Sequence, residues 1–164
     1  LKLTPLSSHE CQSRFYGLTD AQVYDELKRE MDIKINAEDF ISLKTEAVFK
    51  HLGSSKLLNN KLEALLNEIK NQNYPIVLVT SSEKKITMKI LEQEKMLSIF
   101  KAVFTREDTE DNKPHPAPYL EAMKLCGVKP NEVLIFEDSP SGLEAAERSG
   151  AHVIQVKWFN HPIV

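Results

Sequence analysis

Two adjacent carboxylates end an apolar run in the last third of this sequence. Residues 133–136 read Val-Leu-Ile-Phe, and Glu137 and Asp138 follow directly. Two like charges beside a buried strand repel each other and lose solvation, unless a cation or hydrogen-bond donors offset them. Carboxylate oxygens are hard ligands that suit Mg²⁺ better than a soft metal. The pair therefore predicts a Mg²⁺ site at a strand end, with Asp138 and Glu137 as ligands.

Two other groups complement the acid pair. Thr80, Ser81 and Ser82 follow the apolar run 76–79, and the N–H groups of a helix opening there could hold an anion. Lys113 lies in a proline-rich stretch just ahead of a predicted helix. Hydroxyl donors, a fixed cation and a metal-binding acid pair together match what charge stabilisation on a transferring phosphoryl group requires.

Each group also has a purely structural interpretation. Threonine and serine commonly cap helices after strands, and most lysines are solvated. His115 fits a turn that positions Lys113 better than it fits an acid or a base, and Cys126 fits a small buried hydrophobe. It is the combination, in this order and at strand ends, that favours a phosphate site over these alternatives.

The elements that must position these groups alternate in type. Short apolar runs flanked by helical patterns indicate strands buried on both faces of a parallel sheet. The pattern predicts strands at 76–79, 101–105, 132–138 and 152–156, with helices at 62–69, 82–96, 118–126 and 141–149. Such alternation predicts a doubly wound, mostly parallel α/β sheet, in which ligands bind outside the carboxyl ends of the strands.

The first third of the chain has no strand-like run. Thr19 and Gln22 form a capping-box pattern ahead of a helix with apolar residues on every fourth position. A second helix is predicted over 37–51, and the Gly-Ser-Ser stretch at 53–55 is a candidate linker. We therefore expect a small all-helical domain at 1–54 and an α/β core at 55–164.

Composition limits the possible functions. The 164 residues are 41% hydrophobic and 27% charged, with a net charge of -3, as in an ordinary soluble globular protein. Mixed, slightly acidic charge argues against a nucleic-acid partner, and no apolar run reaches the roughly 20 residues of a membrane span. Two cysteines without a CxxC pair favour a reducing, cytoplasmic location and no structural zinc.

Three stretches, "VLVTSS", "NKPHPAPYL" and "VLIFEDSPSGLEAAERSGA", resemble the second, third and fourth motifs of the haloacid dehalogenase superfamily of phosphohydrolases. The closer likeness is to its β-phosphoglucomutase-like branch, which carries a helical cap. The resemblance implies that Thr80 binds phosphate and that Lys113 balances the charge of the phosphate and the nucleophile. It also implies that Asp138 holds Mg²⁺, with Glu137 assisting directly or through water.

The helical first third resembles the beginning of that family's cap. "ECQSRFYGLTDAQVYDELKRE" is similar to the first half of a cap, with Gly17, Thr19 and Asp20 in its substrate-facing loop. The family's Asp-x-Asp nucleophile motif, on the strand before the cap, has no counterpart in a sequence that starts at Leu1. We therefore expect an incomplete core that lacks its first strand, two half-sheets, and an upstream segment of roughly 30 to 40 residues that carries the nucleophile.

The resemblance implies a Mg²⁺-dependent phosphatase of small phosphorylated metabolites, such as sugar phosphates, acting through an aspartyl-phosphate. A phosphomutase is less favoured, because the loop at 17–22 offers Asp20 but no cation; Ala47 stands where a mutase would have its cap lysine, although Lys44 lies one turn away. The alternatives are a non-catalytic relative that lost its nucleophile and a plain adaptor. We expect this chain to be inactive alone, a monomer or weak homodimer, with no nucleic-acid or membrane partner.

Overall fold

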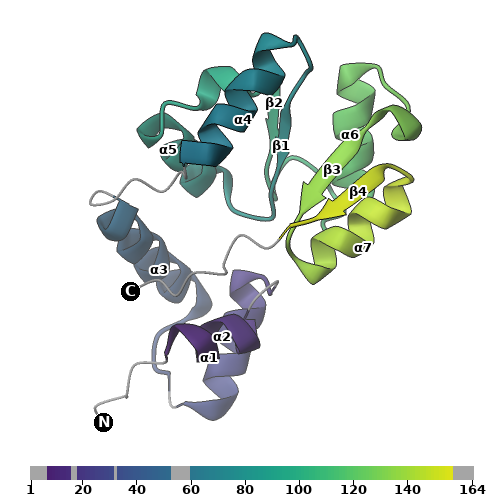
Figure 1. Ribbon diagram of the computed structural model, residues 1–164. Coiled ribbons are helices and arrows are strands. Elements are labelled where there is room, and N and C mark those ends of the chain that lie inside the picture. The colour runs from purple at the N-terminus through teal and green to yellow at the C-terminus, as the bar shows by residue number, and fades with distance from the viewer. Residues whose placement is uncertain (1–6, 16–17, 32, 53–59, 157–164) are drawn as a thin grey trace.

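The computed structural model of the protein describes residues 7–15, 18–31, 33–52 and 60–156 (Figure 1). Helices and parallel strands alternate after residue 60, as the sequence pattern predicts. The elements in chain order are α1 (Ser8–Phe15), α2 (Asp20–Glu30), α3 (Ala37–Leu52), α4 (Asn60–Asn71), β1 (Val77–Val79), α5 (Lys84–Gln93), η1 (Leu97–Ile99), β2 (Ala102–Phe104), α6 (Ala117–Cys126), η2 (Pro130–Glu132), β3 (Leu134–Glu137), α7 (Pro140–Ser149) and β4 (His152–Gln155).

The three N-terminal helices lie together on one side of the strands (Figure 1). The predicted capping box at the start of α2 is present: the Thr19 side chain accepts a hydrogen bond from the Gln22 amide, and the Gln22 side chain accepts one from the Thr19 amide. Tyr24 of α2 is buried, and its ring centroid lies 5.7 Å from that of Phe40 in α3. Aromatic packing thus joins these two helices.

The strands form two separate parallel pairs. β1 pairs with β2, and β3 pairs with β4, with Val77 opposite Ala102 and Ile135 opposite Val153. Within the residues that the structure describes, no ladder of backbone hydrogen bonds joins β1 to β3. The doubly wound, parallel character of the fold is confirmed, and its sheet is divided in two.

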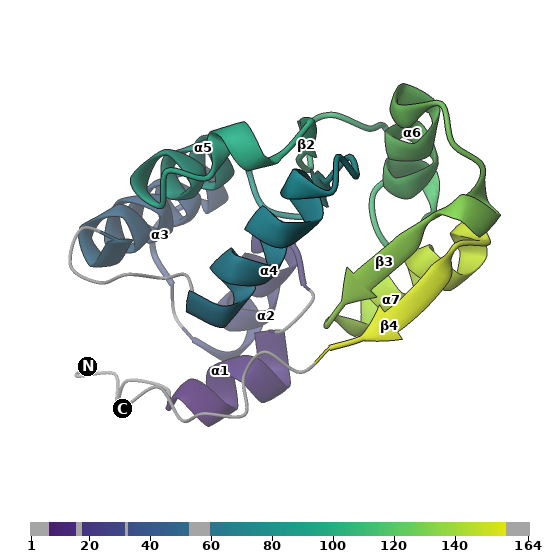
Figure 2. The ribbon, with the colours of Figure 1, turned by 45° about the horizontal axis from the view of Figure 1, so that its top comes forward.

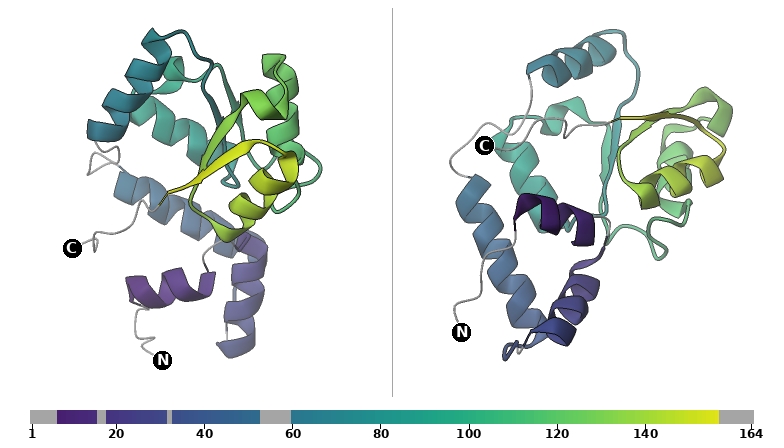
Figure 3. Two further views of the ribbon diagram at one scale, coloured as in Figure 1. Left: turned by 45° about the vertical axis from the view of Figure 1, so that its right-hand side comes forward. Right: turned by 60° about the horizontal axis from the view of Figure 1, so that its bottom comes forward.

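The main core lies between β3 and the last two long helices. Ile135 projects into it, Ala145 and Ala146 of α7 are fully buried there, and Tyr119 and Met123 come from α6. The contacts place α7 against both β3 and β4, on the outer side of that pair in Figure 3. Small alanines on α7 let the helix approach the strands closely.

The prediction of strands buried on both faces is wrong for β3 and β4. Leu134 and Phe136 are 50% and 46% exposed, and Ile154 of β4 is also exposed. Side chains alternate along a strand, so these residues share the face opposite Ile135. A continuous apolar run does not reveal that helices cover only one of its faces.

Helix ends follow local chemistry. Gly127 and Gly150 end α6 and α7 with left-handed φ angles of 69° and 79°, as expected for glycine stops. The helix predicted from Ser82 to Met96 is shorter, because residues 80–82 form a turn in which the Ser82 amide binds the Thr80 hydroxyl. That helix, α5, begins at Lys84.

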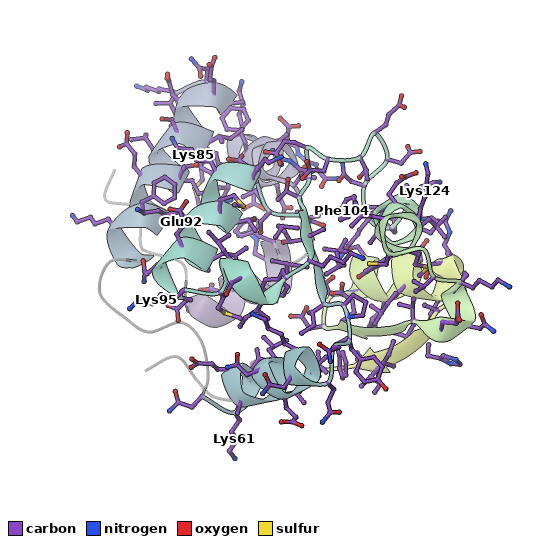
Figure 4. All side chains as sticks on the ribbon, turned by 90° about the horizontal axis from the view of Figure 1, so that it is seen from above. Lys61, Lys85, Glu92, Lys95, Phe104 and Lys124 are labelled. Atoms are coloured by element: carbon purple, nitrogen blue, oxygen red, sulfur yellow. The ribbon has the colours of Figure 1, made fainter. Side chains whose placement is uncertain are left out.

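The N-terminal helices contact the α/β part through α3, which lies beside α5 (Figure 2). The ammonium of Lys85, labelled in Figure 4, lies 5.6 Å from the ring centroid of Phe49. The predicted domain boundary at 54/55 lies outside the described residues, so the division into a cap and a core stays a prediction. None of the described helices is both long and apolar enough to cross a membrane.

Candidate active site

One lysine joins the carboxyl ends of strands from the two different pairs. The Lys113 ammonium donates to the main-chain carbonyl of Val79, at the end of β1, over 3.1 Å. It also donates to Oε2 of Glu137, at the end of β3, over 2.7 Å. The Lys113 side chain is only 6% exposed. The structure thus brings together two of the residues that the sequence predicts, Lys113 and Glu137.

The carboxylate of Glu137 accepts hydrogen bonds from five donor atoms. Oε2 accepts from Lys113 and, over 2.5 Å, from the Tyr119 hydroxyl. Oε1 accepts from the amides of Asp138 and Ser139 and from the Ser139 hydroxyl. The charge of this buried acid is therefore offset by a lysine and by neutral donors of the protein.

These contacts decide the ionisation of Glu137. Burial raises the pKa of its carboxyl group, but the positive charge of Lys113 and the hydrogen bonds from Lys113, Tyr119 and Ser139 outweigh burial and lower the pKa to about 2. Glu137 is thus an anion at neutral pH. Burial, followed by the hydrogen bond to Glu137, raises the pKa of Tyr119 above its usual value, which keeps the phenol protonated as a donor.

The start of α7 is built around the same carboxylate. Ser139 is the N-cap, and its hydroxyl accepts from the Gly142 amide over 3.0 Å while it donates to Glu137. A Cβ placed on Gly142 would overlap Cδ and both carboxylate oxygens of Glu137. The anion therefore lies at the positive end of the helix, which favours its charge.

The loop that carries Lys113 is fastened to α7. The Arg148 guanidinium donates to the carbonyl of Pro114 over 3.0 Å. His115 accepts a hydrogen bond at Nδ1 from the amide of Ala117, at the start of α6. This contact agrees with the interpretation of His115 as part of a turn that positions the lysine.

The hydroxyls after β1 are arranged differently from the prediction. The Thr80 hydroxyl accepts from the Ser82 amide over 3.1 Å, which leaves its own O–H to donate to an anion. Ser81 and Ser82 are exposed. The first amide of α5 is not available to a phosphate, because the Lys84 N–H donates to both carboxylate oxygens of Glu107. Of this group, Thr80 remains the best candidate phosphate ligand.

The predicted cap loop is only partly described. Gly17 lies outside the described residues. Thr19 uses its hydroxyl as the N-cap of α2. Asp20 is buried and forms an ion pair with Lys44 of α3. A contact of these residues with substrate stays a prediction.

The Mg²⁺ site that the sequence predicts is at Asp138 and Glu137, at the end of β3. Mg²⁺ usually binds one or two carboxylates and keeps several waters. Half-buried Asp138 directly follows β3, and both oxygens of Glu137 accept hydrogen bonds from the protein. In the part of the chain that the structure describes, no group of three or more His, Cys, Asp or Glu side chains could hold a metal. Asp138 as a ligand, with Glu137 acting through water, stays a prediction.

Sequence reasoning did not assign roles to Tyr119 and Gly142. Tyr119 lies six residues after Lys113, in the same quoted stretch, but an aromatic residue early in a helix usually signals a core position. Gly142 follows Ser139 in a helix-start pattern, where a glycine gives no hint that a carboxylate lies against it. In the sequence, only the motifs that contain Tyr119 and Gly142 could have pointed to these roles, because neither residue type indicates its contact by itself.

Parallel strand pairs separated by helices, with a buried lysine and acids at the strand ends, define an α/β protein with a charged site at its carboxyl edge. This chain belongs to the haloacid dehalogenase-like hydrolase family, whose model matches residues 2–156.

Two bacterial relatives have names that mention phosphate chemistry. The putative phosphatase YhcW of Bacillus subtilis is 35% identical over 133 residues, which cover 81% of this chain and 60% of that protein. The pyrophosphatase PpaX of Bacillus cereus (strain AH820) is 31% identical over 93 residues, 57% of this chain and 43% of that protein. The chain thus spans less than two thirds of the length of either relative.

Solved structures share the fold. A putative β-phosphoglucomutase from Thermotoga maritima superposes with a TM-score of 0.77 at 23% identity, covering 97% of this chain and 74% of that one. A predicted phosphoglycolate phosphatase from Haemophilus somnus gives a TM-score of 0.80 at 21% identity, covering 99% and 76%. At these identities the likeness concerns the fold alone.

Proposed function

We propose that this chain takes part in the Mg²⁺-dependent hydrolysis of small phosphorylated metabolites. The observation that carries the proposal is the Lys113 ammonium, which lies between the carboxyl ends of β1 and β3 and beside the hydroxyl-bearing turn at Thr80. A fixed buried cation at this edge of a parallel fold is suited to bind phosphoryl oxygens.

In this proposal, Thr80 and Lys113 bind the oxygens of the phosphoryl group. Glu137 holds Lys113 in place through its hydrogen bond, and Asp138 would hold the Mg²⁺ ion, which supplies further positive charge when bound. By family resemblance, the group that attacks phosphorus would be an aspartate of an Asp-x-Asp motif, which the given sequence does not contain. The interval between β1 and β3, whose ends Lys113 joins, would hold the strand that carries such a motif.

The names of the relatives support phosphate chemistry and leave the substrate open. One is a putative phosphatase and the other a pyrophosphatase. We further propose that residues 1–54 act as a cap that excludes water and selects the substrate. A cytoplasmic monomer or weak homodimer, without nucleic-acid or membrane partners, completes the proposal.

A phosphomutase is the second candidate, and one contact favours it. The ion pair of Lys44 with Asp20 brings a cation to the loop at 17–22, which has no cation of its own. A sugar bisphosphate would need such a charge for its distal phosphate. If the protein releases inorganic phosphate from a sugar monophosphate and does not convert it into an isomeric sugar phosphate, it is a phosphatase and not a mutase.

The test is phosphate release from p-nitrophenyl phosphate, with Mg²⁺ and with EDTA, by this chain and by a version extended upstream to include an Asp-x-Asp motif. We expect activity only in the extended protein, its loss with EDTA, and its loss in Lys113→Ala. The matched control is Lys124→Ala, because Lys124 is exposed on α6. An extended protein that is folded but inactive would overturn the proposal and favour a non-catalytic relative.

A further inference from the structure

Tyr119 contacts both members of the Lys113–Glu137 pair. Its hydroxyl donates to Oε2 of Glu137 over 2.5 Å, the same oxygen that accepts from Lys113. Its ring faces the Lys113 ammonium, which lies 4.8 Å from the ring centroid. Tyr119 is 5% exposed, so these contacts form away from solvent.

We propose that Tyr119 is a positioning residue for Lys113, which directs the lysine ammonium toward a bound phosphoryl group and prevents Glu137 from fully neutralising it. The inference deepens the proposed function and rests on it for the identity of the ligand.

The first step of the argument is the count of donors. A lysine ammonium has three N–H bonds. Among the residues that the structure describes, Val79 and Glu137 are the two acceptors of Lys113. The ring of Tyr119 also lies against the ammonium and attracts its charge without accepting a strong hydrogen bond. One N–H therefore remains for an anion.

The second step concerns the strength of the ion pair. Oε2 of Glu137 shares its negative charge between two donors, the ammonium and the phenol. Without the hydroxyl, the same oxygen would attract Lys113 alone and hold it closer. The phenol thus weakens the hold of Glu137 on Lys113, and a phosphoryl oxygen can compete for the ammonium.

The third step concerns placement. Tyr119 is in the first turn of α6, where its amide donates to the carbonyl of Pro116. The lysine and the tyrosine are therefore the two ends of one short loop-to-helix segment. The helix orients the ring, and the ring limits the directions in which the Lys113 side chain can point.

The test compares Tyr119→Phe, which removes only the hydroxyl, with Tyr119→Leu, which also removes the ring. The matched control is Met123→Leu, a volume-conserving change at a buried position on the same helix. The first readout is acylation of the Lys113 amine by an N-hydroxysuccinimide ester, quantified by peptide mass spectrometry. Lys124, which points away from α6 in Figure 4 and is 77% exposed, is the internal reference.

We expect Tyr119→Phe to slow acylation of Lys113 by about twofold or more, because Glu137 then holds the ammonium tightly. Tyr119→Leu also lacks the hydroxyl, but its Lys113 should be acylated faster than in Tyr119→Phe, because the ring no longer lies against the ammonium. Met123→Leu should leave the rate unchanged. Loss of packing alone would accelerate acylation in both tyrosine variants. Acceleration in both, or no change in Tyr119→Phe, would overturn the proposal.

The second readout is the affinity for inorganic phosphate, measured by calorimetry on the same proteins. We expect Tyr119→Phe to weaken binding several-fold at an unchanged melting temperature. A wild-type chain that binds phosphate as tightly as Tyr119→Phe does would overturn the positioning role. A wild-type chain that binds no phosphate would count against the proposed function, and the acylation result would then decide the role of Tyr119 by itself.

Discussion

Gly142 and Glu137 are in such close contact that the helix start accommodates the carboxylate only because residue 142 has no side chain. A Cβ at this position would overlap Cδ and both carboxylate oxygens of Glu137. Replacing a helical glycine with alanine normally stabilises a protein by about 1 kcal/mol. We expect Gly142→Ala to destabilise this one by roughly 1 to 3 kcal/mol instead, because the carboxylate must leave its donors.

Urea unfolding at neutral pH measures this change. The matched control is Glu144→Ala, on the exposed side of the same helix, for which we expect a change within about 0.5 kcal/mol. A stabilised Gly142→Ala protein would show that the carboxylate can move at no cost. The contact would then have no structural importance.

Removal of Lys113 should leave a buried charge without its partner. Both side chains of the Lys113–Glu137 pair are less than 10% exposed. Breaking such a pair by removing one member costs about 3 to 5 kcal/mol, whereas removing both costs much less. We expect Lys113→Met to lower the free energy of unfolding by that amount, and Lys113→Met with Glu137→Gln to recover part of it.

A double-mutant cycle of urea unfolding gives the coupling between the two residues. The control pair is Lys124 and Glu121, which form an exposed ion pair on α6 worth less than about 1 kcal/mol. Additive effects at Lys113 and Glu137 would mean that the two side chains do not interact in solution.

The depressed pKa of Glu137 predicts a loss of stability in acid. The pKa is about 2 in the folded protein, compared with an ordinary value of 4.5. A carboxyl group with a lowered folded pKa contributes stability above its unfolded pKa, and this contribution is lost as the pH falls toward the folded pKa. We expect the free energy of unfolding to decrease between about pH 4.5 and 2.

Glu137→Gln should show a flatter dependence in the same range, measured by urea unfolding at a series of pH values. Asp108, whose pKa is also lowered to about 2, chiefly by the hydrogen bond from the Thr105 hydroxyl, titrates alike in both proteins. The difference between the two curves therefore isolates Glu137. Identical curves would contradict the ion pair.

The two hydroxyl caps should differ in importance. Ser139 caps α7 and also donates to Glu137, whereas Thr19 takes part only in the capping box of α2. Loss of a cap typically costs about 0.5 to 2 kcal/mol. We expect Ser139→Ala to be near the upper end of this range and to weaken phosphate binding, and Thr19→Ala to be near the lower end. Equal effects on phosphate binding would contradict the difference.

Much of the fold follows from local patterns. Apolar runs locate the four strands, and Gly127 and Gly150 locate two helix ends, because these signals depend on neighbouring residues alone. The start of α5 was misplaced, since Ser82 looks like an N-cap but is part of a turn held by Thr80. The exposure of Leu134 and Phe136 could not be predicted, because an apolar run does not say which of its faces is covered.

The sequence predicts which residues form the site better than it predicts the hydrogen bonds that those residues make. Strand ends of a parallel fold converge, so Lys113 and Glu137 could be placed near each other from their positions in the sequence. That both oxygens of Glu137 accept hydrogen bonds depends on side-chain directions in α6 and α7, which no sequence spacing specifies. Tyr119 enters the site for the same reason, through the angle at which α6 follows the loop.

The Lys113 side chain connects the two strand pairs, because it donates hydrogen bonds both to Val79, at the end of β1, and to Glu137, at the end of β3. An anion that binds this ammonium in the folded protein, and has no such site in the unfolded chain, must stabilise the fold by mass action. We expect binding of an anion at Lys113 to slow amide hydrogen exchange in β1 and in β3 at the same time. Both strand pairs would then exchange their amide protons more slowly, although the ligand binds only at their carboxyl ends.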